Sequence, residues 1–372
     1  MTLKRILYFS RDFTIHDQRF LTALAESEYK VYFLQLERNQ APSKKRPLPV
    51  KIEPVSWASQ NTNVHPQDIP RLLPEVEKVI SQIQPDLIHA GPIQRSAYLV
   101  ALTDFQPLVS MSWGYDLIFD AKRDATWEHI TRYTLSRSSV MVGDCKTIRK
   151  LAISYGMPDE RIVTFPWGID LEHFSPSRTK QDRTSFTILS NRAWEPIYGV
   201  DVIARAFALA AQEHPDLRLR LLGNGSQANL LKRIFKEANV SQQVEFSGQV
   251  DQSQLPDVYR SADLYVSASH SDGTSISLLE ALACGCPALV SDIPGNREWI
   301  EPGVQGWLFP DGNYEALAQM MIDASKQRQE LTIMSKQARK LAEQRANWKI
   351  NFPRLLDAYH MALNSQTATN KT

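Results

Sequence analysis

Residues 264–283 read LYVSASHSDGTSISLLEALA, which is a strand pattern, a polar loop and a helix pattern in that order. Leu264–Val266 is a short apolar run of the kind found in buried parallel strands, and apolar residues recur at helical spacings in 276–283. Ser275 and Ser277 both suit a helix N-cap, so the first backbone N–H groups of the helix would face outward. Such a helix terminus favours an anion, and the stretch therefore predicts a βα unit with a phosphate site at its loop.

Glu280 lies about one turn inside this predicted helix. A carboxylate there can reach the two hydroxyls of a ribose beside the bound phosphate. The alternative is an ordinary residue on a solvated helix face, but its neighbours Leu278, Leu279 and Ala281 are too apolar for such a face. We therefore expect Glu280 to have a role in binding.

The same alternation of short apolar runs and helical patterns extends outward in both directions and is typical of parallel sheets covered by helices. The predicted strands are Arg5–Phe9, Val31–Leu36, Leu87–His89, Leu108–Ser112, Val140–Val142, Phe186–Leu189, Leu217–Leu222, Val244–Phe246, Leu264–Val266, Pro287–Val290 and Gly306–Leu308. The predicted helices include Gln18–Glu26, Leu72–Ile83, Val200–Gln212, Ala228–Ala238, Ser277–Ala283, Tyr314–Ser325, Gln329–Gln344 and Ile350–Leu363. The fold class is α/β.

The length of 372 residues is more than twice the roughly 150 of a typical domain, which predicts two domains. A polar stretch at 175–185 separates the two βα series and is typical of an interdomain connection. We therefore expect a first domain at 1–175, a second at 176–345, a final helix at 346–364 and a disordered tail at 365–372.

Charge and cysteine content exclude several classes of protein. Lys and Arg number 42 against 41 Asp and Glu, so the chain lacks the basic excess of a nucleic-acid-binding protein. Three cysteines are too few for a disulfide framework or a four-ligand zinc site, and we expect no metal and a reducing, cytoplasmic location. The basic, proline-rich segment 40–51 is either a solvated loop or a contact for an anionic acceptor or lipid headgroup. Peripheral contact with the inner face of a membrane thus stays open.

Polar residues that directly follow strands are the first candidates for a site, because ligands of doubly wound sheets bind beyond the carboxyl ends of the strands. In the second half these residues describe one rim with glycines and a cation. They are Asn191 and Arg192, the turn 223–225, Ser247 and Gly248, and the loop 267–275.

Asp272–Ala283 resembles the acidic-x7-Glu motif of retaining glycosyltransferase family 4, enzymes with the GT-B fold that use nucleotide-sugar donors. Further segments fall in the family's order, strongly over 140–325 and more weakly over 1–139. They are 166–170 (PWGID), Arg192 with Gly199, 244–248 (VEFSG), 292–298 (DIPGNRE), 306–310 (GWLFP), 85–89 (PDLIH) and 113–116 (WGYD). The resemblance implies two Rossmann-like α/β/α domains that face each other across a cleft, with a C-terminal helix that crosses back to the first domain.

The resemblance also implies roles for individual residues. Arg192 would hold the donor pyrophosphate, Glu280 the ribose and Asp272 the hydroxyls of the donor sugar. Backbone amides of Gly273, Thr274, Ser275 and Ile276 would lie near sugar and phosphate, and Gly223, Gly248 and Val250 along the nucleoside. Three departures from the family pattern stand out. Asp272 stands where Glu is usual, and Tyr198 stands where the donor loop usually has Lys. Residues 11–14 (RDFT) replace the paired glycines common after the first strand, and Trp113 stands where many relatives have His.

For the reaction, the family implies retention of the anomeric configuration without a metal, and the sequence has no Asp-x-Asp triplet of the metal-dependent type. Arg192 and the amides of 274–277 would stabilise the leaving diphosphate. Asp116 and His89, at strand ends of the first half, are candidates for orienting the acceptor hydroxyl, although each also fits a structural role. Arg11, Trp113 and Gly114 are further acceptor candidates.

The predicted donor is a nucleoside-diphosphate hexose, with UDP favoured over GDP and glucose taken as the commonest sugar. The predicted acceptor is a saccharide or lipid-linked saccharide of exopolysaccharide or cell-envelope polysaccharide synthesis. Two alternatives remain. Tyr198 in place of Lys fits a nucleotide-sugar-binding protein without activity, and residues 223–228 (GNGSQA) with Glu245 imitate the fingerprint of an NAD-dependent oxidoreductase.

Overall fold

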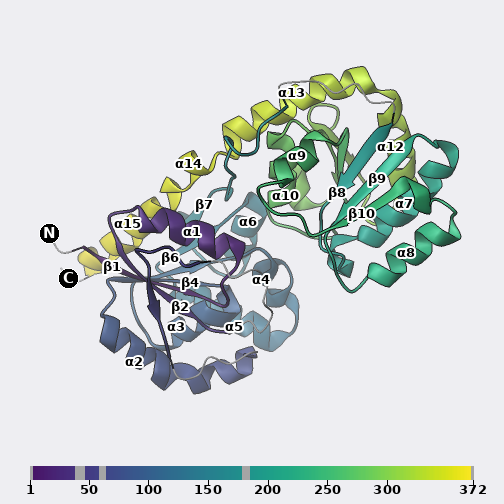
Figure 1. Ribbon diagram of the computed structural model, residues 1–372. Coiled ribbons are helices and arrows are strands. Elements are labelled where there is room, and N and C mark those ends of the chain that lie inside the picture. The colour runs from purple at the N-terminus through teal and green to yellow at the C-terminus, as the bar shows by residue number, and fades with distance from the viewer. Residues whose placement is uncertain (1–2, 38–46, 58–63, 178–184, 370–372) are drawn as a thin grey trace. The chain divides into compact units, whose positions relative to one another are not determined.

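The computed structural model describes residues 3–37, 47–57, 64–177 and 185–369, with side chains up to 365. The chain forms two compact units (Figure 1). Unit 1 comprises Met1–Phe165 together with Phe352–Thr372, and unit 2 comprises Pro166–Asn351. The chain thus enters unit 2 ahead of the polar stretch at 175–185, of which 178–184 lie outside the described residues.

Unit 1 contains a seven-stranded parallel sheet in the order β3-β2-β1-β4-β5-β6-β7. Its strands are β1 (Arg5–Ser10), β2 (Lys30–Gln35), β3 (Glu53–Val55), β4 (Leu87–Gly91), β5 (Leu108–Met111), β6 (Val140–Gly143) and β7 (Ile162–Thr164). The sequence did not predict β3 or β7, because three residues are too few to show a pattern. Pro54 in β3 is compatible with an edge strand, which has no neighbouring strand on one side and so does not need every backbone N–H as a donor.

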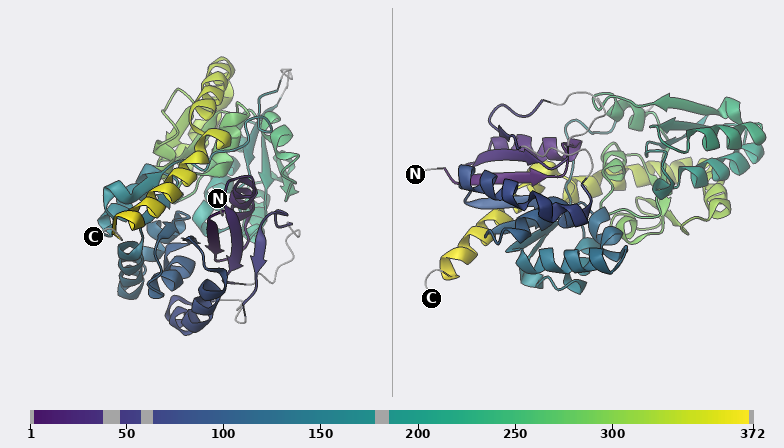
Figure 2. Two further views of the ribbon diagram at one scale, coloured as in Figure 1. Left: turned by 90° about the vertical axis from the view of Figure 1, so that its left-hand side faces the viewer. Right: turned by 90° about the horizontal axis from the view of Figure 1, so that it is seen from below.

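Helices cover both faces of this sheet (Figure 2). They are α1 (Ile15–Ala25), α2 (Leu73–Ile83), α3 (Tyr98–Leu102), α4 (Tyr115–Ile118), α5 (Ala125–Arg137), α6 (Lys146–Ser154) and α15 (Pro353–Thr369), with 3-10 turns at Pro66–Leu72, Asp120–Lys122 and Asp159–Arg161 and a π-helical turn at Ile93–Ala97. Leu7 and Phe9 of β1 pack in one core cluster with residues of α2 and α3, whereas Tyr8 between them lies on the opposite face, against His89.

The last helix, α15, packs against β4, β5, β6 and β7 of unit 1. Leu355, Ala358, Tyr359 and Ala362 of this helix are buried. The helix continues to Thr369, so residues 365–369 are helical where we expected a disordered tail, and 370–372 lie outside the described residues.

Unit 2 contains a six-stranded parallel sheet in the order β10-β9-β8-β11-β12-β13. Its strands are β8 (Phe186–Ser190), β9 (Leu217–Leu222), β10 (Val244–Gly248), β11 (Leu264–Ser267), β12 (Ala288–Ser291) and β13 (Gly306–Phe309). Its helices are α7 (Val200–Glu213), α8 (Ala228–Glu237), α9 (Leu255–Arg260), α10 (Ile276–Ala283), α11 (Pro294–Arg297), α12 (Tyr314–Lys326), α13 (Arg328–Arg345) and α14 (Trp348–Asn351), with 3-10 turns at Pro196–Tyr198 and Ser241–Gln243.

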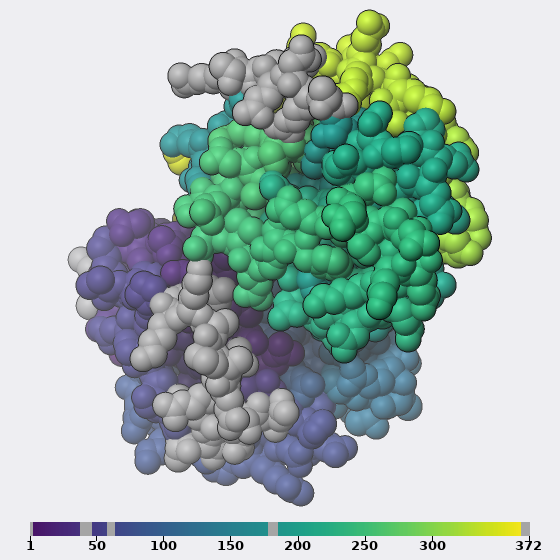
Figure 3. All heavy atoms as spheres, turned by 45° about the vertical axis from the view of Figure 1, so that its right-hand side comes forward, coloured from purple at the N-terminus to yellow at the C-terminus, as the bar shows by residue number. Residues whose placement is uncertain are grey.

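Two core clusters of unit 2 lie on the two faces of this sheet. One gathers residues of α7, α8 and α12, and the other gathers residues of α9, α10 and the second half of α13. In the space-filling view the atoms of this unit, from teal to yellow-green, form one closely packed body (Figure 3). The order of strands and helices predicted for this half agrees with the structure, and most predicted ends lie within one or two residues of the observed ones. Helix α9 and the short helices were not predicted.

Each sheet has one point where the chain order reverses. In unit 1 it lies between β1 and β4, and in unit 2 between β8 and β11. At such a point the loops after two neighbouring strands leave in opposite directions and open a crevice beyond the strand ends. These are the places where the fold itself positions a ligand.

Candidate functional site

The switch point of unit 2 brings together residues that lie some eighty positions apart. Arg192 follows β8, and Asp272 and Ser275 follow β11. The Arg192 guanidinium donates from Nη2 to Asp272 Oδ2 at 2.8 Å and from Nη1 to Ser275 Oγ at 2.9 Å. Three of the residues predicted for the donor site thus form one hydrogen-bonded group at the reversal of the sheet.

Arg192 is a cation in a largely enclosed place, with 11% of its side chain exposed. Burial disfavours the charged guanidinium, but the Asp272 carboxylate and nearby tyrosine hydroxyls outweigh it and raise the pKa of Arg192. The guanidinium carbon lies 4.2 Å from the centre of the Tyr198 ring, within cation–π distance. Its Nε is buried and has no hydrogen-bond partner. The group therefore retains one unused donor in a place shielded from water.

Helix α10 begins directly beside this cation. Ser275 is its N-cap in extended backbone conformation, and its Oγ accepts a hydrogen bond from the Leu278 N–H at 3.5 Å. Of the two serines considered as caps, the structure selects Ser275. Thr274 and Ser275 are buried, Gly273 and Asp272 precede them in the loop, and Ile276 is the first helical residue. The positive end of the helix dipole and the guanidinium thus point to the same region.

Glu280 is buried within α10, with 5% of its surface exposed. Its Oε2 lies 2.8 Å from the Tyr259 hydroxyl, which is also 3.1 Å from the Ser277 carbonyl oxygen and accepts a hydrogen bond from Asn191 Nδ2 at 2.6 Å. Burial raises the pKa of Tyr259 well above its usual value, and the Glu280 carboxylate adds to that shift. Tyr259 therefore connects the loop after β8 to the carboxylate on α10.

The sequence did not reveal Tyr259, because α9 was not predicted. The available signal was Pro256 at the first turn of a helix, with Val258 and Tyr259 following at apolar positions. That signal predicts a helix but does not indicate a hydrogen bond to a residue 21 positions away.

The two glycine turns predicted for the nucleoside lie side by side. The Gly223 N–H donates to the Gly248 carbonyl oxygen at 2.8 Å, and half-buried Val250 packs against the core cluster that contains α10. Both turns follow strands at one end of the sheet, β9 and β10.

The turn at Gly223 belongs to the segment 223–228 that imitates the dinucleotide-binding fingerprint. It does connect a strand to a helix, but β9 is one strand removed from the reversal between β8 and β11. Glu245 is the second residue of β10, before the carboxyl end of the strand, and its carboxylate accepts hydrogen bonds from Arg220 Nε at 2.9 Å and Ser247 Oγ at 2.6 Å. A carboxylate that is paired in mid-strand does not match one that binds a ribose at a strand end.

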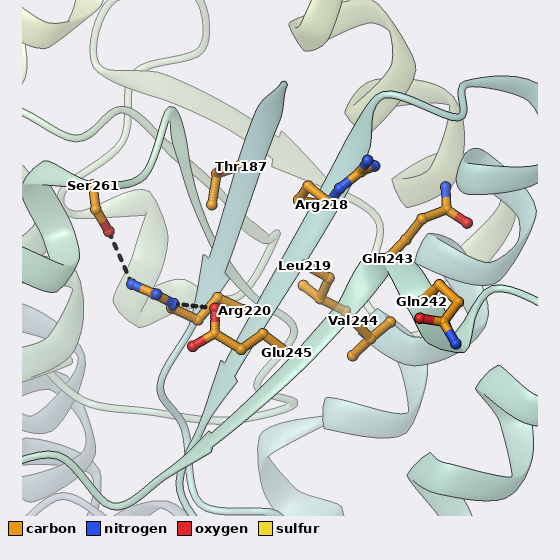
Figure 4. Close-up of a pocket in the computed structure, with 9 residues that line it drawn as sticks. All are labelled: Thr187, Arg218, Leu219, Arg220, Gln242, Gln243, Val244, Glu245 and Ser261. Atoms are coloured by element: carbon orange, nitrogen blue, oxygen red, sulfur yellow. Dashed lines mark hydrogen bonds and ion pairs between the residues drawn. The ribbon is translucent and has the colours of Figure 1, made fainter. Parts of the chain in front are cut away.

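A cavity of about 490 Å³ lies at the β9-β10 edge of the same sheet (Figure 4). Its lining is Thr187, Arg218, Leu219, Arg220, Gln242, Gln243, Val244, Glu245 and Ser261. Arg220, the central cation in Figure 4, is already bound to Glu245 and to Ser261 Oγ. The lining residues that belong to strands occupy the first and middle parts of β8, β9 and β10, and Gln242 and Gln243 precede β10. The cavity therefore lies away from the carboxyl ends of the strands, and we assign it no donor-binding role.

In unit 1, His89 on β4 is buried and makes a hydrogen bond through Nδ1 to the Tyr359 hydroxyl of α15 at 2.6 Å. Burial lowers its pKa to about 3, so the imidazole is neutral near neutral pH. On the same side the Tyr8 ring lies 4.6 Å from the His89 ring, tilted by 60°, and the Tyr8 hydroxyl donates to Asp17 of α1 at 3.2 Å. This network holds α1 and α15 on the sheet, which fits the structural alternative for His89.

We predict that His89 makes unit 1 less stable in acid. The pKa of His89 is 6.5 in the unfolded chain and about 3 in the folded one. The contribution of the neutral imidazole to the free energy of unfolding is therefore complete above pH 6.5 and is lost as pH falls toward 3. The loss is on the order of a few kcal/mol. Denaturant unfolding of the wild type and of His89→Gln at several pH values measures it. The free energy of unfolding should fall less steeply below pH 6.5 in the variant, and parallel curves would contradict the assignment.

Asp116 is fully enclosed and its carboxylate is saturated. It accepts from the Ile93 N–H at 3.0 Å, the Leu117 N–H at 2.9 Å, the Ser112 hydroxyl at 2.6 Å and the Trp113 N–H at 3.3 Å. Burial raises its pKa and these hydrogen bonds partly offset the shift. The side chain ties the loop after β4 to the loop after β5, and this arrangement also fits the structural alternative.

The remaining acceptor candidates lie at the same carboxyl edge of unit 1. The Gly114 N–H is 3.1 Å from Ser112 Oγ, the Trp113 ring lies 5.9 Å from that of His16, and Arg11 follows β1 beside Asp12 at 3.3 Å. Arg11, Trp113 and Gly114 thus follow strands β1 and β5, on either side of β4.

Within the described ranges no group of three or more His, Cys, Asp and Glu side chains could hold a metal ion. Cys145, Cys284 and Cys286 are all buried. Among the described helices none is both long and apolar enough to span a bilayer. Lys44, Lys45 and Arg46 of the basic segment lie outside the described residues.

Two sequence profiles match the chain. "Glycosyl transferases group 1" matches residues 173–341 and "Glycosyl transferase 4-like" matches residues 5–143. A D-inositol 3-phosphate glycosyltransferase of Thermobispora bispora is 30% identical over 58% of this chain and 54% of its own length. The chain spans about half or less of the length of the first curated relatives it matches.

Solved structures resemble the whole chain. Sucrose-phosphate synthase of Thermosynechococcus elongatus has a TM-score of 0.80 at 16% identity, covering 97% of this chain and 100% of that one. The Anabaena protein HepE, in complex with UDP-glucose, has a TM-score of 0.77 at 18% identity, covering 96% and 99%. At these identities the likeness shows a shared fold.

Proposed function

The chain belongs to the group 1, family 4-like glycosyltransferases and has their GT-B architecture of two Rossmann-like units, and we propose that it transfers a hexose from a nucleoside-diphosphate sugar to a saccharide. The observation that carries this proposal is the convergence of Arg192 and the α10 N-terminus at the switch point of unit 2. A fixed cation and a helix N-terminus in one crevice provide a binding site for a diphosphate.

In this proposal the donor diphosphate binds at Arg192. The buried, unpartnered Nε would donate to a phosphate oxygen, which would remove the cost of a desolvated donor without an acceptor. Arg192 stays in place between the Tyr198 ring and Asp272, so little reorganisation is needed when charge develops. Tyr198 thus supports the cation from its face, in the position where relatives have a second cation.

The other proposed donor contacts lie around the diphosphate site at Arg192. Glu280, oriented by Tyr259, would accept hydrogen bonds from the ribose hydroxyls, and the paired turns at Gly223 and Gly248, with Val250, would lie along the base. Asp272 would share its carboxylate between Arg192 and the hydroxyls of the donor sugar, and the amides of Gly273 to Ile276 would face the sugar and the phosphate.

For the reaction we propose attack from the face that the diphosphate leaves, with retention of the anomeric configuration. The bond from the anomeric carbon to the phosphate oxygen breaks as the bond to the acceptor oxygen forms, and the leaving phosphate oxygen takes the acceptor proton. Arg192 and the dipole of α10 would stabilise the charge on the departing diphosphate. The chain's own part in this step is electrostatic.

UDP is the proposed nucleotide. The HepE complexes with UDP and UDP-glucose, together with the family's usage, support it. We predict that UDP raises the melting temperature more than GDP does and that NADH has no effect. A ligand stabilises the folded state according to its affinity, by about 2.7 kcal/mol when it is present at 100 times its Kd, so the nucleotide that binds most tightly gives the largest shift. Thermal melting with each nucleotide measures this. Stabilisation by NADH alone would support the oxidoreductase instead.

Activity separates the transferase from an inactive binding protein. We expect release of UDP from at least one sugar in a panel of UDP- and GDP-linked hexoses that includes UDP-glucose. Binding of UDP with no nucleotide release above a buffer blank, with saccharide acceptors present, would support the inactive alternative.

The acceptor side is proposed from the resemblance: a saccharide or lipid-linked saccharide in exopolysaccharide or envelope polysaccharide synthesis, used in the cytoplasm or at the inner face of a membrane. Unit 1 would bind it at the carboxyl ends of β1, β4 and β5, where Arg11, Trp113 and Gly114 lie. His89 and Asp116 would support that edge from within the unit.

A further inference from the structure

Three arginines gather at the switch point of unit 1. Arg11 directly follows β1, Arg95 follows β4 within the π-helical turn Ile93–Ala97, and Arg123 lies in the connection from β5 to α5. β1 and β4 are the two strands between which the order of this sheet reverses. Arg11, Arg95 and Arg123 are called the arginine cluster below. The fold places the cluster where a doubly wound sheet binds its ligand.

A single indole ring holds two members of the cluster together. The guanidinium carbon of Arg123 lies 4.1 Å from the centre of the Trp127 ring, and that of Arg95 lies 5.2 Å from the same centre. Arg95 also donates from Nη1 to the Val64 carbonyl oxygen. Its backbone departs from helical geometry (φ −124°, ψ −105°) inside the π-helical turn, a rare element that is frequent at functional sites. Like charges are thus fixed close together.

Three carboxylates lie close to the arginines of the cluster. Asp120 binds Arg123 at 2.6 Å, and Asp12 and Glu37 lie 3.3 and 3.7 Å from Arg11. Their side chains are 14%, 15% and 12% exposed, whereas those of Arg11 and Arg123 are 43% and 48% exposed. The side chains of Arg11 and Arg123 are therefore more exposed than the acids that pair with them.

Two further observations indicate that the three arginines form one connected group and that one of their N–H donors is unused. Burial raises the pKa of Asp120, and the charges of Arg123, Arg95 and Arg11 act on it in the opposite direction, so all three lie near this one carboxylate. Arg11 Nε is buried and has no hydrogen-bond partner, and the Glu37 carboxylate oxygen lies 3.7 Å from it.

From this arrangement we infer that the arginine cluster binds a phosphate group of the acceptor, so that the acceptor is a phosphorylated saccharide. Guanidinium forks match the geometry of phosphate oxygens, and three of them on neighbouring loops can reach one phosphate or diphosphate. The inference rests on the proposed function, because it identifies the substrate class of the unit that would bind the acceptor. The phosphate can belong to a soluble sugar phosphate or to a lipid-linked saccharide at a membrane surface, and the chemistry is the same.

The test uses inorganic pyrophosphate as a probe in the full-length Arg192→Ala variant, which lacks the donor-side cation. We expect calorimetric titration to detect pyrophosphate binding, and the additional change Arg123→Gln to weaken it at least about tenfold. Arg95→Gln should act in the same direction and serves as a second variant. Melting curves establish that each variant is folded.

Arg132→Gln is the matched control. Arg132 also lies in unit 1, with 49% of its side chain exposed, an ion pair to Glu128 at 2.9 Å and a tyrosine ring, that of Tyr155, at 5.3 Å. It belongs to α5, away from the carboxyl edge, so its removal should change pyrophosphate affinity less than about twofold.

A second arm identifies the source of the phosphate. Vesicles of phosphatidylglycerol are compared with vesicles of phosphatidylcholine in a sedimentation assay. Arg123-dependent binding of soluble pyrophosphate supports the inference with a soluble phosphate. Arg123-dependent binding of phosphatidylglycerol vesicles alone supports it with a phosphate presented at a membrane. If neither probe binds, or if Arg123→Gln and Arg95→Gln weaken binding no more than Arg132→Gln does, the inference is overturned.

The result is independent of the donor proposal. Absence of UDP stabilisation in the wild type, with Arg123-dependent binding retained, would contradict the proposed donor and leave the anion site in unit 1. UDP stabilisation without any effect of the cluster would contradict the inference alone.

Discussion

Arg192→Ala is expected to lower kcat/KM for the nucleotide sugar at least about a hundredfold and to weaken UDP binding at least about tenfold. Losing charge-assisted hydrogen bonds to a phosphate costs about 1.5–3 kcal/mol in the ground state, and more where charge develops during the reaction. The same change leaves the Asp272 carboxylate without its cation at 2.8 Å, beside the anion it should help to bind. Repulsion between that carboxylate and the diphosphate adds to the loss. Nucleotide release and calorimetry with UDP measure the two effects.

Arg297→Ala is the matched control for this experiment. Arg297 also pairs with an aspartate of unit 2, Asp292, at 2.6 and 2.9 Å, but 59% of its side chain is exposed and it lies outside the Arg192 group. Its removal should change kcat/KM less than about threefold, since exposed pairs contribute at most about 1 kcal/mol. Equal effects of the two substitutions, in folded protein, would refute the assignment of Arg192.

A third variant separates charge from geometry. Arg192→Lys keeps the positive charge but loses the planar fork and the stacking on Tyr198. If a point charge were sufficient, this variant would act like the wild type. We expect most of the loss to remain, because a single ammonium cannot replace both the Ser275 and the Asp272 contact while it serves the diphosphate.

The proximity of Arg192, Asp272 and Ser275 could be predicted from sequence because it depends on strand ends. Once β8 and β11 are recognised as parallel strands, their carboxyl ends must lie at one edge, and Arg192, Asp272 and Ser275 follow them within a few residues. Neighbouring strands then bring the loops into contact without any knowledge of side-chain conformation. The structure adds the distances and the choice of Ser275 as the cap.

The partners of the acidic and titratable residues could not be predicted in the same way. Tyr359 reaches His89 across 270 positions, and Tyr259 reaches Glu280 from the short helix α9, whose sequence does not indicate that contact. Such pairs depend on which face of a helix packs on which strand, and a local pattern does not encode that choice. Asp116 illustrates the consequence, because its strand-end position suggested an accessible carboxylate, whereas four donors surround it.

The two switch points also differ in how they hold their cations. In unit 2 one enclosed guanidinium lies between an aspartate and a tyrosine ring, an arrangement suited to developing charge. In unit 1 three arginines gather close to acids, and the side chains of two of them, Arg11 and Arg123, are about half exposed. That second arrangement suits reversible binding of an anion. The near-neutral total of +1 is therefore compatible with two local positive sites, since the compensating acids are built into each of them.

Gly199→Ala is expected to destabilise unit 2 by at least about 3 kcal/mol, because two costs combine at this position. Gly199 precedes α7 with φ +57°, a left-handed conformation that costs an alanine about 1–2 kcal/mol. A Cβ there would lie 2.1 Å from the Ala268 carbonyl oxygen, in the loop after β11, so backbone must move. That movement would displace the loop that carries Asp272 and Ser275, and UDP affinity should fall together with stability.

Gly303→Ala isolates the backbone term of that prediction. Gly303 also has positive φ, +85°, but a Cβ added there meets nothing within 4 Å. It should cost only the roughly 1–2 kcal/mol of the left-handed conformation and leave UDP affinity unchanged. Denaturant unfolding, with UDP titration of each folded variant, measures the difference. Equal losses of stability would mean that the approach of Gly199 to Ala268 is not a tight contact, and unchanged UDP affinity in a destabilised Gly199→Ala would mean that the loop after β11 does not position the donor group.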